Sequence, residues 1–157
     1  MTRFDAADAP ALVRAAREDA GLTQVALAEL AGVSQPNLAA IESGKRSVSP
    51  ELLEQLLRAA DYRPSVALLR VRDQVLAEMA RYGVEGVSVF GSASRGEDHF
   101  DSDLDVILVA DRADSLRALG LVQRIEELTG FPVDGHLRYS AEASEFGRRM
   151  ISEAVAL

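Results

Sequence analysis

Two aspartates one residue apart, Asp103 and Asp105, stand at the start of an apolar run, and the pair Gly91 and Ser92 follows another. Because side chains alternate faces along a strand, the two aspartates point the same way while Leu104 between them points into a core. Carboxylates on one face repel each other unless a divalent cation lies between them, and such oxygen ligands suit Mg²⁺ or Mn²⁺ better than zinc. The spacing therefore predicts a combined phosphate and metal site.

Short buried strands must position these groups. Residues 87–90 and 104–109 are apolar runs rich in β-branched side chains, which predicts two strands. Residues 131–137 predict a third, with its proline near the start, where a missing N–H is least harmful. This strand carries Asp134, and His136 shares its face by period-two alternation. For Asp134 to join the first two carboxylates, the three strands must be adjacent in one sheet.

The acidic residues also allow interpretations other than a metal site. A calcium-binding EF-hand loop starting at residue 101 is excluded, because its sixth position is Val106 rather than Gly and its twelfth is Arg112 rather than Glu. A solvated acidic loop is disfavoured, since Asp105 lies inside an apolar strand, where an unpaired carboxylate is costly. Asp134 as an ordinary edge-strand acid stays open.

Composition limits the class of protein. The chain has 157 residues, 48% apolar and 27% charged, with no Cys, which indicates one ordinary globular domain or two small ones without disulfides. No apolar run approaches the roughly 18 residues of a membrane span, and the N-terminus lacks a signal-peptide core, so we expect a cytoplasmic protein without membrane contact. The net charge is −8; the first 61 residues carry 6 Lys+Arg against 9 Asp+Glu, and the rest 11 against 16. Any contact with nucleic acid must therefore come from a local patch.

The first part of the chain is predicted to be helical. Thr23, Ser34 and Ser49 each precede an apolar-periodic stretch and are suited to cap a helix. Arg63-Pro64 marks a boundary, because the residue before a proline is pushed out of the α region. The predicted helices cover residues 11–19, 23–31, 34–44 and 49–60.

A family resemblance covers the stretch that begins at residue 22, LTQVALAELAGVSQPNLAAIESGKRSVSPELLEQLLRAA. This stretch resembles the Xre/Cro-repressor family of helix-turn-helix domains. The resemblance implies an all-α five-helix domain over residues 8–62, whose third helix enters the major groove of operator DNA, usually as a homodimer. It also implies a set of DNA-binding residues, in which Gln35 and Asn37 read bases and the others cap the helix or contact phosphate. The DNA-binding set is Gln24, Ser34, Gln35, Asn37, Lys45 and Arg46.

Two residues depart from this family's pattern. Pro36 and Ala40 occupy positions of the third helix where members often carry polar base-contacting side chains. Together with the net acidity, they leave dimerisation or protein docking open as the use of the helical unit.

A second resemblance rests on FGSASRG, SDLDVILV and FPVDGH, which occur in this order with ten residues, 93–102, between the Gly-Ser pair and the D-x-D pair. The order resembles the DNA polymerase β-like nucleotidyltransferase superfamily. It implies a small α/β (α+β) domain with a mixed sheet over residues 63–157. The sequence pattern itself predicts helices near 65–82, 114–129 and 141–155. It further implies Mg²⁺ or Mn²⁺ and an NTP, with ATP expected. The implied metal-binding and catalytic residues are Asp103, Asp105 and Asp134, and the implied nucleotide-binding residues are Gly91, Ser92 and Arg95.

The two halves together resemble antitoxins of toxin–antitoxin modules. This implies a DNA-binding regulator that transfers a nucleoside monophosphate from an NTP to a hydroxyl group of its cognate toxin. Two alternatives stay open: a nucleotidyltransferase that acts on RNA or a small molecule, and a non-catalytic transcription factor that senses nucleotide. A transcription factor that only senses nucleotide has no chemical need for three such carboxylates. The small size of the protein argues against independent processing of large RNA.

Overall fold

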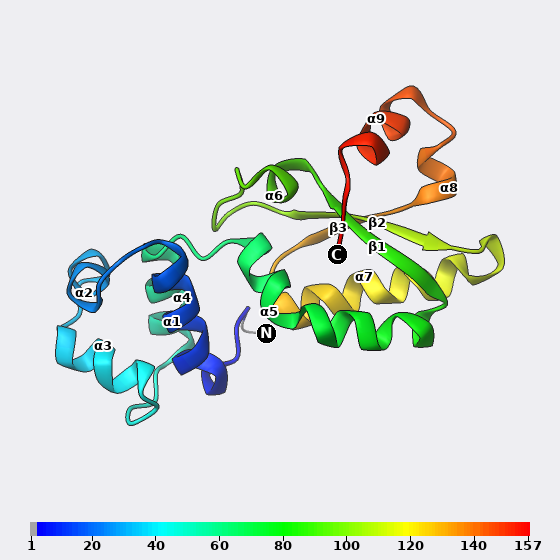
Figure 1. Ribbon diagram of the computed structural model, residues 1–157. Helices are drawn as coiled ribbons and strands as arrows, with labels where there is room; N and C mark the ends of the chain where they lie inside the picture. The colour runs from blue at the N-terminus through cyan, green and yellow to red at the C-terminus, as the bar shows by residue number, and fades with distance from the viewer. Residues whose placement is uncertain (1–2) are drawn as a thin grey trace.

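The computed structural model describes residues 3–157, in which a group of helices precedes a sheet with helices on both faces (Figure 1). Three predicted caps of the helical half are confirmed: Thr23, Ser34 and Ser49 each accept a hydrogen bond from a backbone N–H in the first turn of the next helix. The elements of this half are η1 (Ala6–Asp8), α1 (Ala9–Asp19), α2 (Gln24–Ala31), α3 (Gln35–Glu42) and α4 (Pro50–Ala59).

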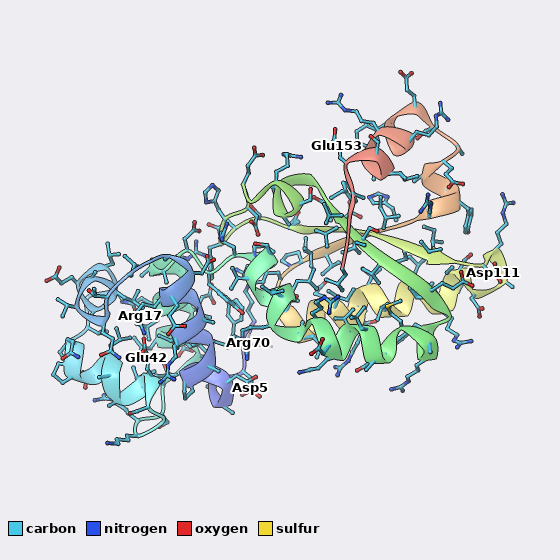
Figure 2. All side chains as sticks on the ribbon, viewed as in Figure 1. Asp5, Arg17, Glu42, Arg70, Asp111 and Glu153 are labelled. Carbon is cyan, nitrogen blue, oxygen red and sulfur yellow. The ribbon has the colours of Figure 1, made fainter. Side chains whose placement is uncertain are left out.

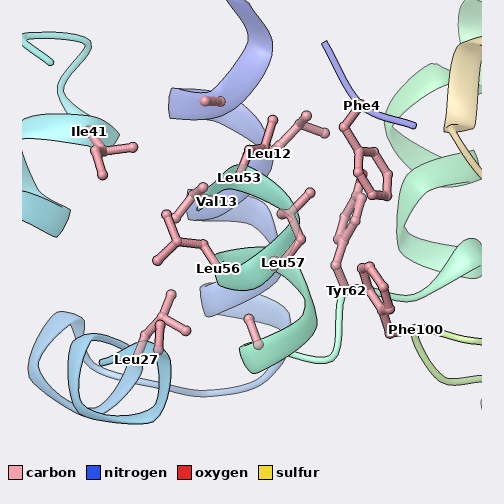
Figure 3. Close-up of a cluster of buried hydrophobic side chains, with 14 of the residues drawn as sticks. Phe4, Leu12, Val13, Leu27, Ile41, Leu53, Leu56, Leu57, Tyr62 and Phe100 are labelled. Carbon is pink, nitrogen blue, oxygen red and sulfur yellow. The ribbon is translucent and has the colours of Figure 1, made fainter. Parts of the chain in front are cut away.

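The core of the helical half is formed by apolar side chains that recur at helical spacing along α1, α2, α3 and α4. Leu27, Ile41, Leu53 and Leu56 are each at most 1% exposed and face one another across α2, α3 and α4 (Figure 3). Burying one such side chain contributes about 1.5–3 kcal/mol, so this core is the main source of the domain's stability.

The second half contains a four-stranded sheet in the order β3-β2-β1-β4. β1 pairs antiparallel with β2 and β4, whereas β2 and β3 are parallel, which confirms the mixed sheet and the adjacency of the three predicted strands. The elements are α5 (Pro64–Glu78), η2 (Met79–Tyr82), β1 (Val84–Phe90), α6 (Gly91–Arg95), β2 (Leu104–Ala110), η3 (Arg112–Asp114), α7 (Ser115–Thr129), β3 (Val133–Leu137), α8 (Arg138–Ala141), α9 (Glu145–Glu153) and β4 (Val155–Ala156).

The two faces of the sheet are covered differently. α5 and α7 lie against one face, where Leu104, Val106 and Leu108 of β2 are buried with them. On the opposite face, Ile107 packs with Met150 of α9. The covering of this second face is partial, because α6, α8 and α9 are short.

The last predicted helix is interrupted. We expected one helix near 141–155, but α8 ends at Ala141 and α9 begins only at Glu145. Ser144 is extended and its hydroxyl accepts the Gly147 N–H at 2.9 Å, which starts a new helix rather than continuing the old one. The chain after Glu153 forms β4, a strand too short for a periodic sequence signal.

Helix α5 belongs to both halves. Its first turn packs into the core of the helical half, where Ala67 is 1% exposed, and its later turns cover the sheet through Val71 and Val75. α5 is thus the fifth helix of the expected five-helix unit. A division of the chain at residue 62 or 63 stays a prediction. Within residues 3–157, no helix has the length and apolar character that a membrane span requires.

Candidate functional site

The predicted carboxylates lie on the sheet face opposite α5 and α7. Since Leu104 and Val106 are fully buried towards those helices, Asp105 between them points to the other face. In the sheet register, Asp105 is opposite Asp134 of β3 on one side and Phe90 of β1 on the other. Neighbouring strands are about 4.8 Å apart, so the structure brings Asp105 and Asp134 side by side from segments 29 positions apart.

His136 completes this face. Its ring lies 5.7 Å from that of Phe90, measured between centroids, and its Nε2 is 3.4 Å from Asp134 Oδ2. The alternation in the sequence had placed Asp134 and His136 on one face, and the contact confirms that placement. A histidine beside this carboxylate can orient it and exchange a proton with it.

Electrostatic repulsion is concentrated at Asp105. Burial raises the pKa of its half-buried carboxyl above the ordinary value, and the negative charges of Asp134 and Asp103 raise it further. His136 and Arg95 oppose this shift but do not outweigh it. The ionised carboxylate is therefore under-compensated by the protein itself.

Gly91 is the residue that allows the backbone to approach Asp105. Its φ is +68°, a left-handed conformation that glycine adopts without steric cost. A Cβ atom at this position would overlap the Asp105 carboxylate. Ser92 follows as the second residue of the short helix α6, so the Gly-Ser pair lies directly against the acidic face as predicted from its position between the strands.

The side chain of Arg95, which is predicted to bind phosphate, contacts two acidic side chains. Its Nε donates to Glu97 Oε2 at 2.7 Å, and its guanidinium also lies 3.9 Å from Glu153. The hydrogen bond to Glu97 raises the pKa of Arg95. To hold a triphosphate, this exposed side chain must exchange Glu97 for phosphate oxygens, so its role stays a prediction.

The donor atoms fit a hard divalent cation, although the side chains are not gathered round one point. Among residues 3–157, no three His, Cys, Asp or Glu side chains are close enough together to hold a metal ion. Asp103 and Asp134 are exposed and can rotate, whereas Asp105 is fixed in the sheet. The uncompensated negative charge at Asp105 is the observation that favours a cation. Mg²⁺ and Mn²⁺ prefer oxygen ligands, and their positive charge would relieve the repulsion between the carboxylates.

A separate chain of polar side chains lies under helix α3 in the helical half. Gln35, the first residue of α3, donates to Gln24 Oε1 at 3.1 Å, and Gln24 donates to Glu42 Oε2 at 3.0 Å. Arg17 donates to both carboxylate oxygens of Glu42, at 2.6 and 3.1 Å, and Figure 2 shows the two side chains meeting between α1 and α3. The network fixes the start of α3 relative to α1 and α2.

The other predicted DNA-binding residues surround the same helix. Ser34 caps α3, and Asn37 accepts a hydrogen bond from Arg46 at 2.7 Å. Lys45 and Arg46 are exposed in the loop after α3. A bidentate contact to adenine uses both the oxygen and the nitrogen of an amide, so Asn37 must exchange its bond from Arg46 to read a base.

Two acidic residues that make long-range contacts, Asp98 and Asp61, are not predicted by the sequence pattern. Asp98 is buried, with no exposed side-chain surface, and accepts hydrogen bonds from the Ser65 N–H and hydroxyl at 2.8 and 3.0 Å. Asp61 accepts the Phe100 N–H at 2.8 Å. Each of the two carboxylates contacts a residue more than 30 positions away in the sequence, and no local sequence pattern predicts such a contact.

Comparisons with known proteins agree with both halves. Residues 13–66 match the family model described as helix-turn-helix, and residues 72–156 match the model described as nucleotidyltransferase domain. A solved structure described as a minimal nucleotidyltransferase shares 33% sequence identity and has a TM-score of 0.52, covering 59% of this chain and 95% of its own. None of the curated proteins compared with the chain matches it.

Proposed function

Because the chain belongs to the nucleotidyltransferase domain family and joins that domain to a helix-turn-helix region, we propose that it is a DNA-binding regulator with transferase activity. We further propose that it is the antitoxin of a toxin–antitoxin pair and modifies a hydroxyl group of its partner protein. The observation that carries the enzymatic part is the pairing of Asp105 with Asp134 beside the Gly91 turn.

The proposed reaction moves a nucleoside monophosphate. The acceptor oxygen forms a bond to the α-phosphorus of an NTP such as ATP, the bond from that phosphorus to the β-phosphate oxygen breaks, and pyrophosphate leaves. The hydroxyl proton passes to Asp134, whose contact with His136 offers it a further proton acceptor. The Gly91-Ser92 backbone and the Ser92 hydroxyl hold the triphosphate against the acidic face, with Arg95 at its outer side.

Asp103, Asp105 and Asp134 would hold Mg²⁺ or Mn²⁺. When bound, such a cation would offset part of the negative charge of the triphosphate and of the carboxylates. The protein's own contribution is to fix Asp105 in β2, to place Asp134 beside it on β3, and to carry Asp103 two residues before it in the chain.

A cavity of about 340 Å³ next to His136 supports a protein acceptor. It lies at the edge of β3 between α7, α8 and α9, and Leu119, Phe146 and Met150 line its apolar walls. Phe146 is 74% exposed at its rim. A tyrosine side chain would bury its ring against such walls and bring its hydroxyl near His136, which lies 3.4 Å from Asp134. β3 is also an edge strand, to which a partner segment can add main-chain hydrogen bonds.

Labelled ATP tests this proposal. The protein is incubated with Mg²⁺, α-³²P-labelled ATP and proteins encoded by neighbouring genes. Label on one neighbouring protein supports transfer to a toxin, whereas label on RNA or a small molecule moves the assignment to those acceptors. If no acceptor takes label, and the Asp103→Ala, Asp105→Ala double variant keeps every cellular effect, the catalytic proposal is wrong.

Gly91→Ala is expected to lower the rate of transfer about 100-fold or more while costing only about 1–2 kcal/mol of stability. The stability cost is that of a left-handed alanine. The rate falls further because the new methyl group pushes the Asp105 carboxylate from its place. Gly96→Ala is the matched control: its φ is +69°, but its Cβ would meet nothing within 4 Å. Initial rates and urea unfolding compare the two, and equal rates in both variants would refute the role of Gly91.

Operator binding should depend on Gln35 and Asn37. The double change Gln35→Ala, Asn37→Ala is expected to weaken binding to the specific site by roughly 100-fold or more, since each good bidentate contact discriminates by about 1–3 kcal/mol. Binding to unrelated DNA should change little. Footprinting upstream of the protein's own gene locates the site, and gel shifts measure affinity. Lys45→Ala is the comparison, because loss of a phosphate contact weakens all sequences alike. Unchanged specific binding by the double variant would show that other residues read the bases.

A further inference from the structure

The segment of residues 96–102 joins the two parts of the candidate transferase site. It begins directly after α6, which carries Gly91, Ser92 and Arg95, and it ends directly before Asp103. We call it the connector segment. Its conformation sets how the phosphate-binding turn lies relative to the carboxylates.

The connector segment is held by the helical half as well as by its own domain, in which Phe100 packs against Phe131 with 6.1 Å between ring centroids. Asp61, which follows α4, accepts the Phe100 N–H at 2.8 Å with one oxygen and lies 2.9 Å from His99 Nδ1 with the other. Burial alone would raise the pKa of Asp61, but the hydrogen bonds from His99 and the Phe100 N–H outweigh it, so the pKa is lowered. The ionised carboxylate is therefore the form that this junction stabilises.

A second carboxylate, Asp98, belongs to the connector segment itself and bonds outwards, whereas Asp61 bonds to the segment from outside. Asp98 points out of the connector segment to the first turn of α5, where it accepts from the Ser65 N–H and hydroxyl. A carboxylate at the start of a helix also interacts favourably with the helix dipole. Arg63 adds a contact of 3.6 Å to Asp98 and one of 3.4 Å to the Gly96 carbonyl.

The segment's aromatic residue is part of the helical core. Phe100 is 3% exposed and lies beside Phe4 and Tyr62 in Figure 3, with ring centroids of Phe4 and Phe100 separated by 6.1 Å. Arg3 stacks over the Phe100 ring at 4.4 Å and donates to its carbonyl at 3.0 Å. Loops normally run over the surface, so burial of this residue in the other half couples the two halves mechanically.

We propose that Asp61 and Asp98 are positioning residues of the transferase site, through which the helix-turn-helix half holds the connector segment and thereby sets NTP affinity. The proposal rests on the proposed function, because it concerns the same site. It predicts that the helical half is required for nucleotide binding although it supplies no nucleotide ligand. If DNA binding shifts the helical half and thereby changes the affinity for NTP, then NTP binding must change the affinity for DNA by the same factor.

Two substitutions at position 61 separate positioning from folding. Asp61 has φ +49°, so Asp61→Gly keeps the backbone conformation while removing both side-chain contacts. Asp61→Asn tolerates the same conformation and retains an oxygen that can accept the Phe100 N–H. Asp73→Asn is the matched control for charge, since this α5 side chain is 98% exposed and far along the helix from Ser65.

The full-length protein is titrated with ATP and Mg²⁺ by calorimetry, and hydrogen exchange is followed at residues 91–103. We expect Asp61→Gly to weaken ATP binding roughly 5- to 50-fold, a typical range for coupling between sites, and to speed exchange there. Asp61→Asn should recover most of the affinity, and Asp73→Asn should match the wild type. If Asp61→Gly fails to fold by circular dichroism, His99→Ala removes one contact of the same carboxylate and should weaken binding several-fold.

The outcomes distinguish this inference from the proposed function. Wild-type ATP affinity in Asp61→Gly, or in His99→Ala where that variant is the one tested, would overturn the positioning role, whether or not transfer occurs. If the wild type binds ATP but transfers it to no acceptor, the proposed function fails and the positioning role is judged on the dissociation constants alone. A wild type that binds no ATP overturns both.

Discussion

Asp105→Asn is expected to reduce nucleotidyl transfer by about 1,000-fold or more and, at the same time, to make the protein without nucleotide more stable. The rate falls because the amide loses one of the negatively charged oxygens that compensate a divalent cation, an electrostatic contribution of several kcal/mol to the transition state. Asn keeps nearly the same shape, so the sheet around position 105 should not change.

Stability should rise because Asp105 is a cost to the folded protein. The side chain is half-buried in β2 opposite Asp134, with Asp103 nearby, and none of the described hydrogen bonds involves its carboxylate. Removing the charge relieves both the desolvation and the repulsion. A gain in unfolding free energy together with a loss of activity is typical of residues kept for function rather than folding.

Asp73→Asn controls for the charge change, since it removes the same charge from a 98% exposed side chain of α5. Initial transfer rates and urea unfolding are measured for both variants, with operator affinity as a check on the helical half. Transfer at the wild-type rate by Asp105→Asn would remove Asp105 from the site. Destabilisation of that variant would show that its carboxylate has a structural partner.

The geometry around Asp105 could be predicted because it depends on local rules. The alternation of side chains in residues 104–108 decides which face Asp105 occupies, and the demand for a third carboxylate decides that β3 lies next to β2. The family resemblance implies glycine at position 91 as a nucleotide-binding residue; the structure adds a different reason for it, a positive φ and a position where a Cβ atom would overlap Asp105.

What could not be predicted depends on contacts between distant segments. β4 has only two residues and exists because it pairs with β1, so no periodicity reveals it. The burial of Phe100 and Asp98 in a polar loop requires knowledge of how the two halves meet. Arg95 shows a third limit, because its pairing with Glu97, two residues further along, cannot be told from the residue types alone.

Arg17→Ala is expected to destabilise the helical half by about 3 kcal/mol at pH 7. Its partner Glu42 has only 2% of its side chain exposed, and breaking a buried pair leaves an uncompensated charge, which typically costs about 3–5 kcal/mol. The lower end applies here because Gln24 still donates to Glu42. Arg17 also donates to the Leu22 carbonyl at 3.0 Å, so the turn before α2 loses a support. Operator binding should weaken as well, since Gln24 and Gln35 continue the same network.

The pH dependence provides the sharpest test of this prediction. Burial alone would raise the pKa of Glu42, but the hydrogen bonds from Arg17 and Gln24 outweigh it and lower the pKa. In the wild type, Glu42 therefore contributes stability that is present above the unfolded pKa of about 4.3 and is lost as the pH falls. In Arg17→Ala, burial should prevail and raise the pKa of Glu42, so protonation on acidification stabilises the variant. The difference between wild type and variant must then shrink between pH 7 and pH 4.

Arg14→Ala is the control, because Arg14 is 54% exposed and contacts the Glu42 carboxylate only weakly, at 4.0 Å from Oε2, which contributes about 1 kcal/mol or less. Arg14 also donates to the Glu42 backbone carbonyl at 3.1 Å, so this control removes a main-chain contact of Glu42 but leaves the carboxylate paired with Arg17. Urea unfolding followed by circular dichroism at several pH values compares the three proteins. Equal losses in Arg14→Ala and Arg17→Ala, or a difference from wild type that grows on acidification, would show that the Arg17–Glu42 pair does not anchor α3. If the difference shrinks as expected, the buried Glu42 carboxylate and its donors Arg17 and Gln24 are what hold α3 in place against α1 and α2.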